Sequence, residues 1–173
     1  MTDSGAQVRS VYIWACEGTW PASVDAALSL APAGARFTLL HVTSAEVPDA
    51  VRGAYAGLLG RAGHDPGTRL EEMAAVSAGE LLQAAADRLG RDCARLEVHG
   101  RAERAVVAAA AQADLLIVAR DGDRTRLGPK SLGKATRFVV DHAPCPVLLV
   151  WPGSAPDVTT IPPPPDHPPP PPR

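Results

Sequence analysis

Two short apolar segments near the end of the chain constrain its fold most strongly. They are Leu115–Ala119 and Val147–Trp151, and neither alternates apolar with polar residues. This pattern predicts parallel strands that are buried on both faces of a sheet. Between them lie a glycine-containing basic loop and a helical segment, whose apolar stripe contains Leu132, Ala135, Val139 and Val140. A strand, loop, helix and strand in this order predict a right-handed parallel crossover.

The preceding segments repeat this alternation. Further strands are expected at Val8–Cys16, Arg36–Val42 and Arg95–Val98, which are rich in β-branched, aromatic or other apolar residues. Helices are expected at residues 20–31, 68–89 and 102–113, with a short, glycine-weakened helix at 47–59. The order predicts an α/β fold, in which a Rossmann-like, open, five-stranded parallel sheet carries helices on both faces.

Two of these helices carry start signals. Thr19 precedes a helix with Pro21 near its first position, so Thr19 is the expected N-cap. Thr68 and Glu71 have the spacing of a capping box, in which the hydroxyl and the carboxylate satisfy each other's free amides. The helix that Thr68 opens is expected to direct these side chains to the core: Leu70, Met73, Leu81, Ala85 and Leu89.

The composition predicts one folded domain with a different tail. The chain has 173 residues and is 46% hydrophobic, which suffices for a single core. Residues 1–7 are expected to be a flexible N-terminus, and residues 8–151 the domain. In residues 152–173 eleven of 22 residues are proline, which predicts polyproline II or disorder. No partner for this tail can be read from its sequence.

Charge and polar residues exclude several classes of function. The formal net charge is -2, which gives no global attraction to nucleic acid or membrane surfaces, and no segment approaches the ~18 apolar residues of a membrane span. A cytoplasmic protein is therefore expected. The three cysteines lie beside or within apolar runs and are expected to be buried free thiols. His41, His99 and His142 have no spaced partner set, so no metal site is predicted.

The loop between residues 120 and 137 concentrates positive charge, with six basic against two acidic residues. Gly122 and Gly133 would let the backbone approach a phosphate closely, and the amides near Ala135 would be free donors at a helix N-terminus. The loop also follows the carboxyl end of a strand, where open α/β sheets bind ligands. A solvated basic loop, whose glycines merely turn the chain, is the alternative interpretation.

The same loop nearly matches the phosphate-binding pattern G-x-x-x-x-G-K-[ST] over residues 128–135. However, Ala135 lacks the hydroxyl that binds Mg²⁺, and Pro129 removes one amide from the cradle. We therefore reject a P-loop NTPase. No Ser-His-Asp set or carboxylate pair can be identified by spacing, so we expect no enzymatic activity.

Four segments together carry a resemblance to a known family. Cys16-Glu17-Gly18-Thr19 is similar to that family's Val-Asp-Gly-Ser after the first strand, and Leu39-Leu40-His41-Val42 matches the end of its second strand. Val98-His99-Gly100 to Glu103 is similar to the turn before its third helix, and the segment from Asp141 to Val147, DHAPCPV, resembles the start of its last strand. Over almost all of Val8–Trp151 the chain therefore resembles the universal stress protein family.

The resemblance implies a homodimer that pairs through the last strand, Val147–Trp151, and ATP or AMP bound through a G-x-x-G-x9-G-[ST] loop. By analogy, Ala15 and Val42 would contact the base through their backbones, and Glu17 would accept hydrogen bonds from the ribose or adenine. The loop departs from the family pattern in three places. Ala119 replaces the first glycine, ten residues separate Gly122 from Gly133, and Lys134 replaces the Ser/Thr.

Three functional hypotheses follow from these observations. The first is a non-enzymatic regulatory domain that binds an adenine nucleotide weakly or in altered fashion. The second is a member of the family that binds no nucleotide and acts as a dimeric interaction module in the stress response. The third, an ATP-hydrolysing or nucleotidyl-transferring enzyme on the same fold, has the least support, since fold does not fix function.

Overall fold

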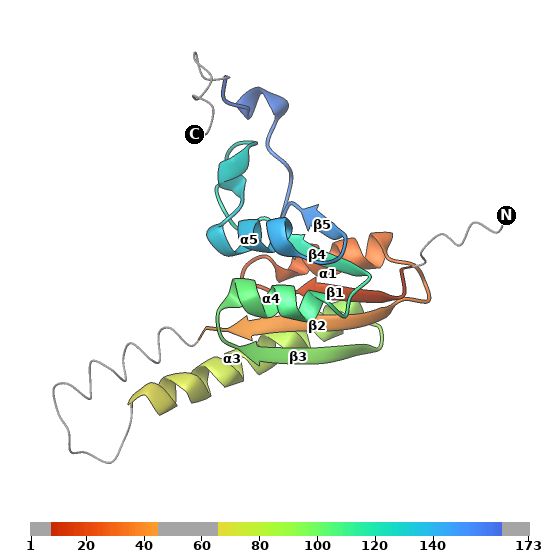
Figure 1. The fold of residues 1–173 in the computed structure, drawn as a ribbon, viewed down its shortest axis with the longest axis vertical. Coiled ribbons are helices and arrows are strands. Elements are labelled where there is room, and N and C mark those ends of the chain that lie inside the picture. The colour runs from red at the N-terminus through yellow and green to blue at the C-terminus, as the bar shows by residue number, and fades with distance from the viewer. Residues whose placement is uncertain (1–7, 45–65, 164–173) are drawn as a thin grey trace.

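The structure is a computed structural model that describes residues 8–44 and 66–163, with the backbone alone described for residues 66–70. Its strands are β1 (Ser10–Trp14), β2 (Arg36–Thr43), β3 (Cys93–His99), β4 (Leu115–Ala119) and β5 (Val147–Val150). Its α-helices are α1 (Trp20–Leu30), α3 (Pro66–Leu89), α4 (Ala102–Ala110) and α5 (Lys134–His142). Two single-turn 3-10 helices, η1 (Pro129–Ser131) and η2 (Val158–Thr160), follow β4 and β5 (Figure 1).

The five strands form one parallel sheet in the order β3-β2-β1-β4-β5, which confirms the predicted fold class. The chain first builds the sheet outward from β1 through β2 to β3, then crosses back and continues from β4 to β5 on the other side. The direction of winding therefore changes between β1 and β4. In sheets of this kind the carboxyl ends of the strands near that point are where ligands bind.

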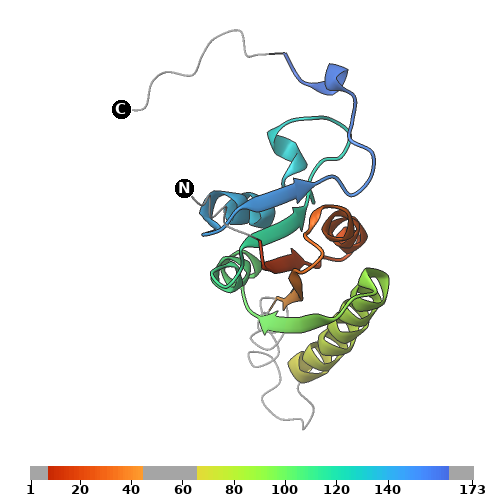
Figure 2. The same cartoon turned by 90° about the vertical axis from the view of Figure 1, so that its right-hand side faces the viewer.

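Helices cover both faces of the sheet (Figure 2). On one face α1 and α3 pack against inward side chains such as Ile13, Leu39 and Ile117, all fully buried. On the other face α4 and α5 cover Leu40 and Leu116. Because successive strand residues point to opposite faces, both sets come from the same strands, and this explains why the strand sequences are apolar throughout.

The ends of the elements correct several details of the sequence interpretation. α3 begins at Pro66, so Thr68 lies inside the helix rather than before it. Thr19 does occupy the N-cap position of α1, but its side chain makes no capping hydrogen bond.

The bounds and faces of the other helices also differ from the prediction. The predicted α5 stripe included Leu132, which precedes the helix, and α4 ends at Ala110 rather than at residue 113. Met73 is 68% exposed, since the first turns of α3 extend past the sheet (Figure 1).

Part of the segment after β5 forms a turn that the predicted polyproline II or disorder did not include, while residues 164–173 lie outside the described residues. β5 ends at Val150, and residues 158–160 form η2, whose N-cap Asp157 accepts a hydrogen bond from the Thr159 amide. This turn forms where residues other than proline interrupt the proline-rich sequence. The predicted helix at residues 47–59 lies outside the described residues. Within the described residues, no helix has the length and apolarity to cross a membrane.

Candidate functional site

A cavity of about 440 Å³ lies at the carboxyl ends of β1 and β2. Its walls are residues 14–17 at the end of β1, residues 41–44 at the end of β2, one side of α3 and the first residue of α4. Another hollow, of about 690 Å³, lies at the opposite edge of the sheet, among residues 10, 12, 35–38, 91–94 and 112. We assign the site to the first cavity, because ligands of parallel α/β sheets bind at the carboxyl edge.

Small side chains shape this cavity. α3 contributes Ala74, Ser77 and Ala78, and α4 contributes Ala102. Because these residues carry at most one heavy atom beyond Cβ, the helices leave a narrow space over the ends of the strands. A flat, mostly apolar ring system fits such a wall, whereas a strongly charged group finds few polar partners there.

One hydrogen bond fixes the geometry where the two strands end in the cavity. The Nδ1 atom of His41 lies 2.8 Å from the carbonyl oxygen of Ala15. A carbonyl only accepts, so Nδ1 carries the proton and the Nε2 atom of a neutral ring is an acceptor. The Ala15 amide in turn donates to the Leu40 carbonyl at 2.8 Å. The backbone of Ala15 is therefore already hydrogen-bonded on both sides, while the exposed Glu17 and half-buried Val42 line the cavity.

The Cys16 thiol also lines the cavity and is poorly suited to chemistry. Its burial, with a further contribution from the negative charge of Asp121, raises the pKa of the thiol to about 12. Nucleophilic cysteines need a lowered pKa. Cys16 is therefore a neutral part of the cavity wall.

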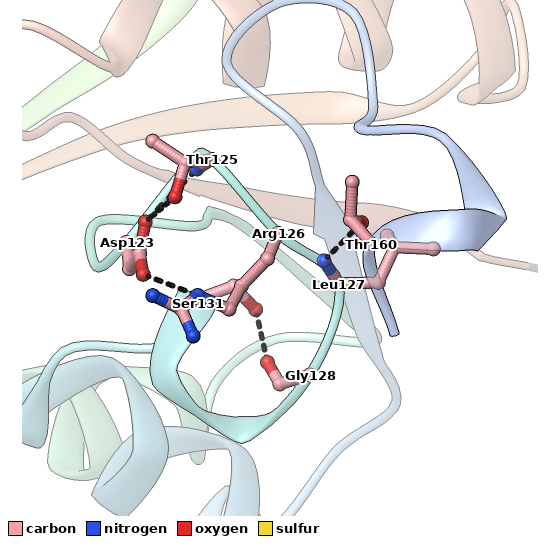
Figure 3. Close-up of polar contacts among 7 residues, drawn as sticks. All are labelled: Asp123, Thr125, Arg126, Leu127, Gly128, Ser131 and Thr160. Atoms are coloured by element: carbon pink, nitrogen blue, oxygen red, sulfur yellow. Dashed lines mark hydrogen bonds and ion pairs between the residues drawn. The ribbon is translucent and has the colours of Figure 1, made fainter. Parts of the chain in front are cut away.

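The basic loop after β4 is closed by its own backbone and side chains (Figure 3). The Gly122 amide donates to the Ser131 carbonyl at 3.0 Å, and the Asp123 amide donates to the Lys130 carbonyl at 2.8 Å. The Asp123 carboxylate accepts from both the amide and the hydroxyl of Thr125, and these bonds hold its pKa below the ordinary value. These contacts join both ends of the loop and its middle to one another.

Packing of the chain on itself accounts for Gly122. A Cβ atom added there would lie 2.3 Å from the Lys130 carbonyl oxygen and 2.8 Å from the Ser131 carbonyl carbon. No side chain fits between these two stretches of backbone. The close approach that the sequence suggested is therefore made to the loop itself.

At Gly133 the neighbour is a carboxylate of the chain. The Gly133 amide, at the N-cap of α5, donates to Asp121 Oδ1 at 2.7 Å. A Cβ atom on Gly133 would lie 2.6 to 2.8 Å from three atoms of the Asp121 carboxylate. The Asp121 carboxylate thus fills the space that the missing side chain of Gly133 leaves at the N-terminus of α5. Lys134 beside it is exposed and Ala135 is half-buried, while Ala119 is buried at the end of β4.

Half of the basic residues in the loop are engaged within the chain. Arg120 stacks on Trp151, with its guanidinium carbon 4.6 Å from the ring centre, and hydrogen-bonds the Ser131 hydroxyl. Arg126 pairs with Asp123 at 3.2 Å, and Arg137 bonds the Pro129 carbonyl. Within the described part of the chain, three basic side chains have no hydrogen-bond or ion-pair partner: Arg124, Lys130 and Lys134. A positive rim therefore persists around the loop.

The sequence-predicted site residues fall into two groups. Ala15, Glu17 and Val42 come together at the cavity, while Ala119, Gly122, Gly133, Lys134 and Ala135 lie along β4, the loop and the start of α5. Sequence reasoning missed the small residues of α3 and the role of Asp121, which it counted only as one acid in a basic loop. No sequence pattern identifies these residues, because only the folded chain brings them to the site. No cluster of three or more metal-binding side chains occurs in residues 8–44 or 66–163.

Solved structures share this architecture. The structure of a universal stress protein in complex with cAMP aligns with a TM-score of 0.57 and 20% identity, covering 86% of this chain and 100% of that one. Universal stress protein UspA from Lactobacillus plantarum aligns with a TM-score of 0.57 and 19% identity, covering 84% and 99%. A hypothetical protein whose biochemical function was assigned from its structure aligns with a TM-score of 0.60 and 19% identity, covering 84% and 96%.

These identities establish the fold alone, and no curated protein sequence matches the chain. A sequence model provides the stronger evidence, because the model of the Universal stress protein family matches residues 19–150. The match spans most of the chain and contains the basic loop, the last strand and the cavity walls that come from β2, α3 and α4. This chain belongs to the universal stress protein family.

Proposed function

We propose that this protein is a cytoplasmic, non-enzymatic regulatory domain that binds an adenine nucleotide, ATP or AMP, weakly or in altered fashion. The cavity at the carboxyl ends of β1 and β2 is the observation that carries this proposal. Its volume of about 440 Å³ lies within the range of small-molecule sites, and its narrow walls suit a flat base. A structural neighbour is a universal stress protein in complex with cAMP, which supports an adenine nucleotide as the class of ligand.

The described residues offer partners for each part of such a ligand. The base would lie against Ala74, Ala78 and Ala102, with the His41 Nε2 atom as an acceptor at the cavity wall. The exposed Glu17 at the edge of the cavity is placed to accept from ribose hydroxyls. Phosphates would extend toward the positive rim of the loop. Occupancy would then change the loop and, through it, the contacts with a second chain or a partner.

Calorimetric titration of adenosine, AMP and ATP into the full chain tests this proposal. The informative variant is Ser77→Phe, because Ser77 lines the cavity from an exposed helix position and a ring there obstructs the opening. Ala75→Phe is the matched control, since Ala75 is exposed on the same helix and does not line the cavity. We expect saturable binding that Ser77→Phe weakens about tenfold or more and Ala75→Phe leaves unchanged. Absence of binding by folded wild-type protein would contradict the proposal.

The edge of the sheet supports a second candidate, a dimeric interaction module. Among the described strands β5 pairs only with β4, so its other edge is open, and all four of its residues are half-buried rather than buried. An open apolar edge strand is a ready surface for pairing with another chain. Analytical ultracentrifugation tests this candidate. A dimer at micromolar concentration is expected, whereas a monomer at every concentration would exclude pairing through β5.

A further inference from the structure

The N-terminus of α5 already holds an anion that belongs to the protein. Asp121 accepts the Gly133 amide at 2.7 Å, and its carboxylate occupies the space that the missing side chain of Gly133 leaves. The next three amides, those of Lys134, Ala135 and Thr136, have no partner within the helix, because the first intrahelical bond runs from Arg137 to Gly133. A carboxylate at this end of a helix is favoured by the helix dipole. Asp121 thus holds the position that suits a phosphate group.

The same carboxylate leaves the sheet at the edge where the cavity lies. Asp121 is two residues past the end of β4 and Cys16 two residues past the end of β1, and the two strands are parallel neighbours. Cys16 is part of the cavity wall, and the charge of Asp121 contributes to the raised pKa of its thiol. A nucleotide whose base filled the cavity would direct its phosphates toward the basic rim past this negative charge. Like charges in proximity repel, and the repulsion increases with each charge on the ligand. The electrostatic cost that Asp121 adds to binding is therefore smallest for a nucleoside, intermediate for a nucleoside monophosphate and largest for a nucleoside triphosphate.

We propose that Asp121 is the specificity-determining residue of this site: its carboxylate takes the place of a phosphate at the N-terminus of α5, so the cavity favours adenosine and AMP over ATP. The inference rests on the proposed function, because it concerns the ligand of the same cavity. It also explains how the site differs from a phosphate cradle although the rim remains basic. The residue acts through both volume and charge, and two variants separate these contributions.

Asp121→Asn keeps an oxygen that can accept the Gly133 amide and removes the charge, whereas Asp121→Ala removes both. Asp123→Asn is the matched control, because it removes one negative charge from the same loop at a carboxylate that bonds Thr125 and Arg126 instead. The measured quantity is the ratio of the dissociation constants for ATP and adenosine, obtained by calorimetry on the full chain. We expect each Asp121 variant to lower this ratio about tenfold or more, with adenosine affinity unchanged and no effect of Asp123→Asn.

Titration with inorganic tripolyphosphate tests the role of Asp121 independently of the adenine site, because this probe has no base. We expect it to bind Asp121→Ala and to bind wild-type protein at least tenfold more weakly. If adenosine does not bind but tripolyphosphate discriminates in this way, the proposed function and the preference for adenosine fail, while the claim that Asp121 occupies the phosphate position stands. If adenosine binds and neither ratio changes in the Asp121 variants, the role of Asp121 is wrong and the proposed function stands. An equal gain in ATP or tripolyphosphate affinity from Asp123→Asn would also contradict the role of Asp121, since the loss of any negative charge in the loop would then explain the effect.

Discussion

The backbone amide of Leu127 donates a hydrogen bond to the hydroxyl oxygen of Thr160, 3.0 Å away, and so ties the basic loop to the segment after the last strand (Figure 3). The Thr160 hydroxyl itself donates to the Asp157 carbonyl at 2.6 Å. Pro162 lies near the same place, with its Cδ atom 4.0 Å from a Cβ position built on Gly128. The start of the tail is therefore part of the loop's surroundings, and experiments on the loop need the full chain.

Thr160→Val is expected to loosen the loop without unfolding the domain. The substitution preserves shape and removes both hydrogen bonds of the Thr160 hydroxyl, the one from the Leu127 amide and the one to the Asp157 carbonyl. Each such bond typically contributes about 0.5–1.5 kcal/mol. Hydrogen exchange should show faster exchange of the Leu127 amide, while amides in β1 and β4 keep their protection. Val158→Ala is the control, because Val158 is 69% exposed. Unchanged exchange at Leu127 in Thr160→Val would show that this contact does not order the loop.

Gly122→Ala is expected to destabilise the protein because the added methyl group meets backbone at 2.3 Å. Overpacking of this kind costs about 1–3 kcal/mol, and a urea titration measures it. Gly34→Ala is the matched control, because a Cβ atom at Gly34 meets nothing within 4 Å and its φ is not positive. That variant should remain within about 0.5 kcal/mol of wild type. Equal stability of the two variants would contradict the described closure of the loop.

Asp114 makes the stability depend on pH. Its carboxylate accepts the amides of Arg9 and Ser10, both at 2.9 Å, and these bonds hold the pKa of Asp114 below the ordinary value. A depressed pKa in the folded state contributes stability that is present above about pH 4 and is lost as the pH falls through the folded value.

Urea midpoints at pH 7 and pH 3 check this prediction. Asp114→Asn should be less stable than wild type at pH 7, and the difference should shrink at pH 3. Asp141→Asn, at an exposed position of α5, serves as the control. A difference between Asp114→Asn and wild type that does not vary with pH would mean that the ionised carboxylate is not what these amides stabilise.

Cys16 should be an unreactive thiol. In a Cys93→Ser, Cys145→Ser background, the alkylation rate should continue to rise with pH beyond pH 10, because the pKa of Cys16 is about 12. An ordinary cysteine with a pKa near 8.5 would reach a plateau about one to two pH units above that value. Such a plateau would contradict the described burial of the Cys16 side chain. Adenosine should slow the reaction further, since Cys16 lines the cavity.

Sequence periodicity predicted the architecture because burial in a parallel sheet demands uninterrupted apolar runs. β4 was predicted with its observed bounds, Leu115–Ala119, and the other strands to within two residues at each end. Helix faces were predicted less well. In α1 the apolar Leu28 and Leu30 are 42% and 65% exposed, while the polar Ser23 is fully buried. Which residues of a helix face the sheet depends on its rotation against the strands, which composition does not specify.

The candidate site was predictable only where it depends on strand ends. The family resemblance suggested Ala15 and Val42, and Glu17 was suggested by its place at the end of the first strand. The three residues lie together because the carboxyl ends of parallel strands meet at one edge of the sheet. The pairing of Asp121 with Gly133 could not be predicted, because eleven residues separate them and the path of the loop decides the contact. Likewise, no sequence pattern predicted that Thr160 would bond Leu127 from the proline-rich segment.

The position of bound adenosine tests the proposed nucleotide site most directly. Amide chemical shifts of the ¹⁵N-labelled full chain should be recorded during titration with adenosine. We expect saturable shifts at Ala15, Val42, Ser77 and Ala102, which line the cavity at the carboxyl ends of β1 and β2. Shifts centred instead on Phe37, Cys93 and Gln112, in the hollow at the opposite edge of the sheet, would contradict it. So would the absence of any shift at millimolar adenosine.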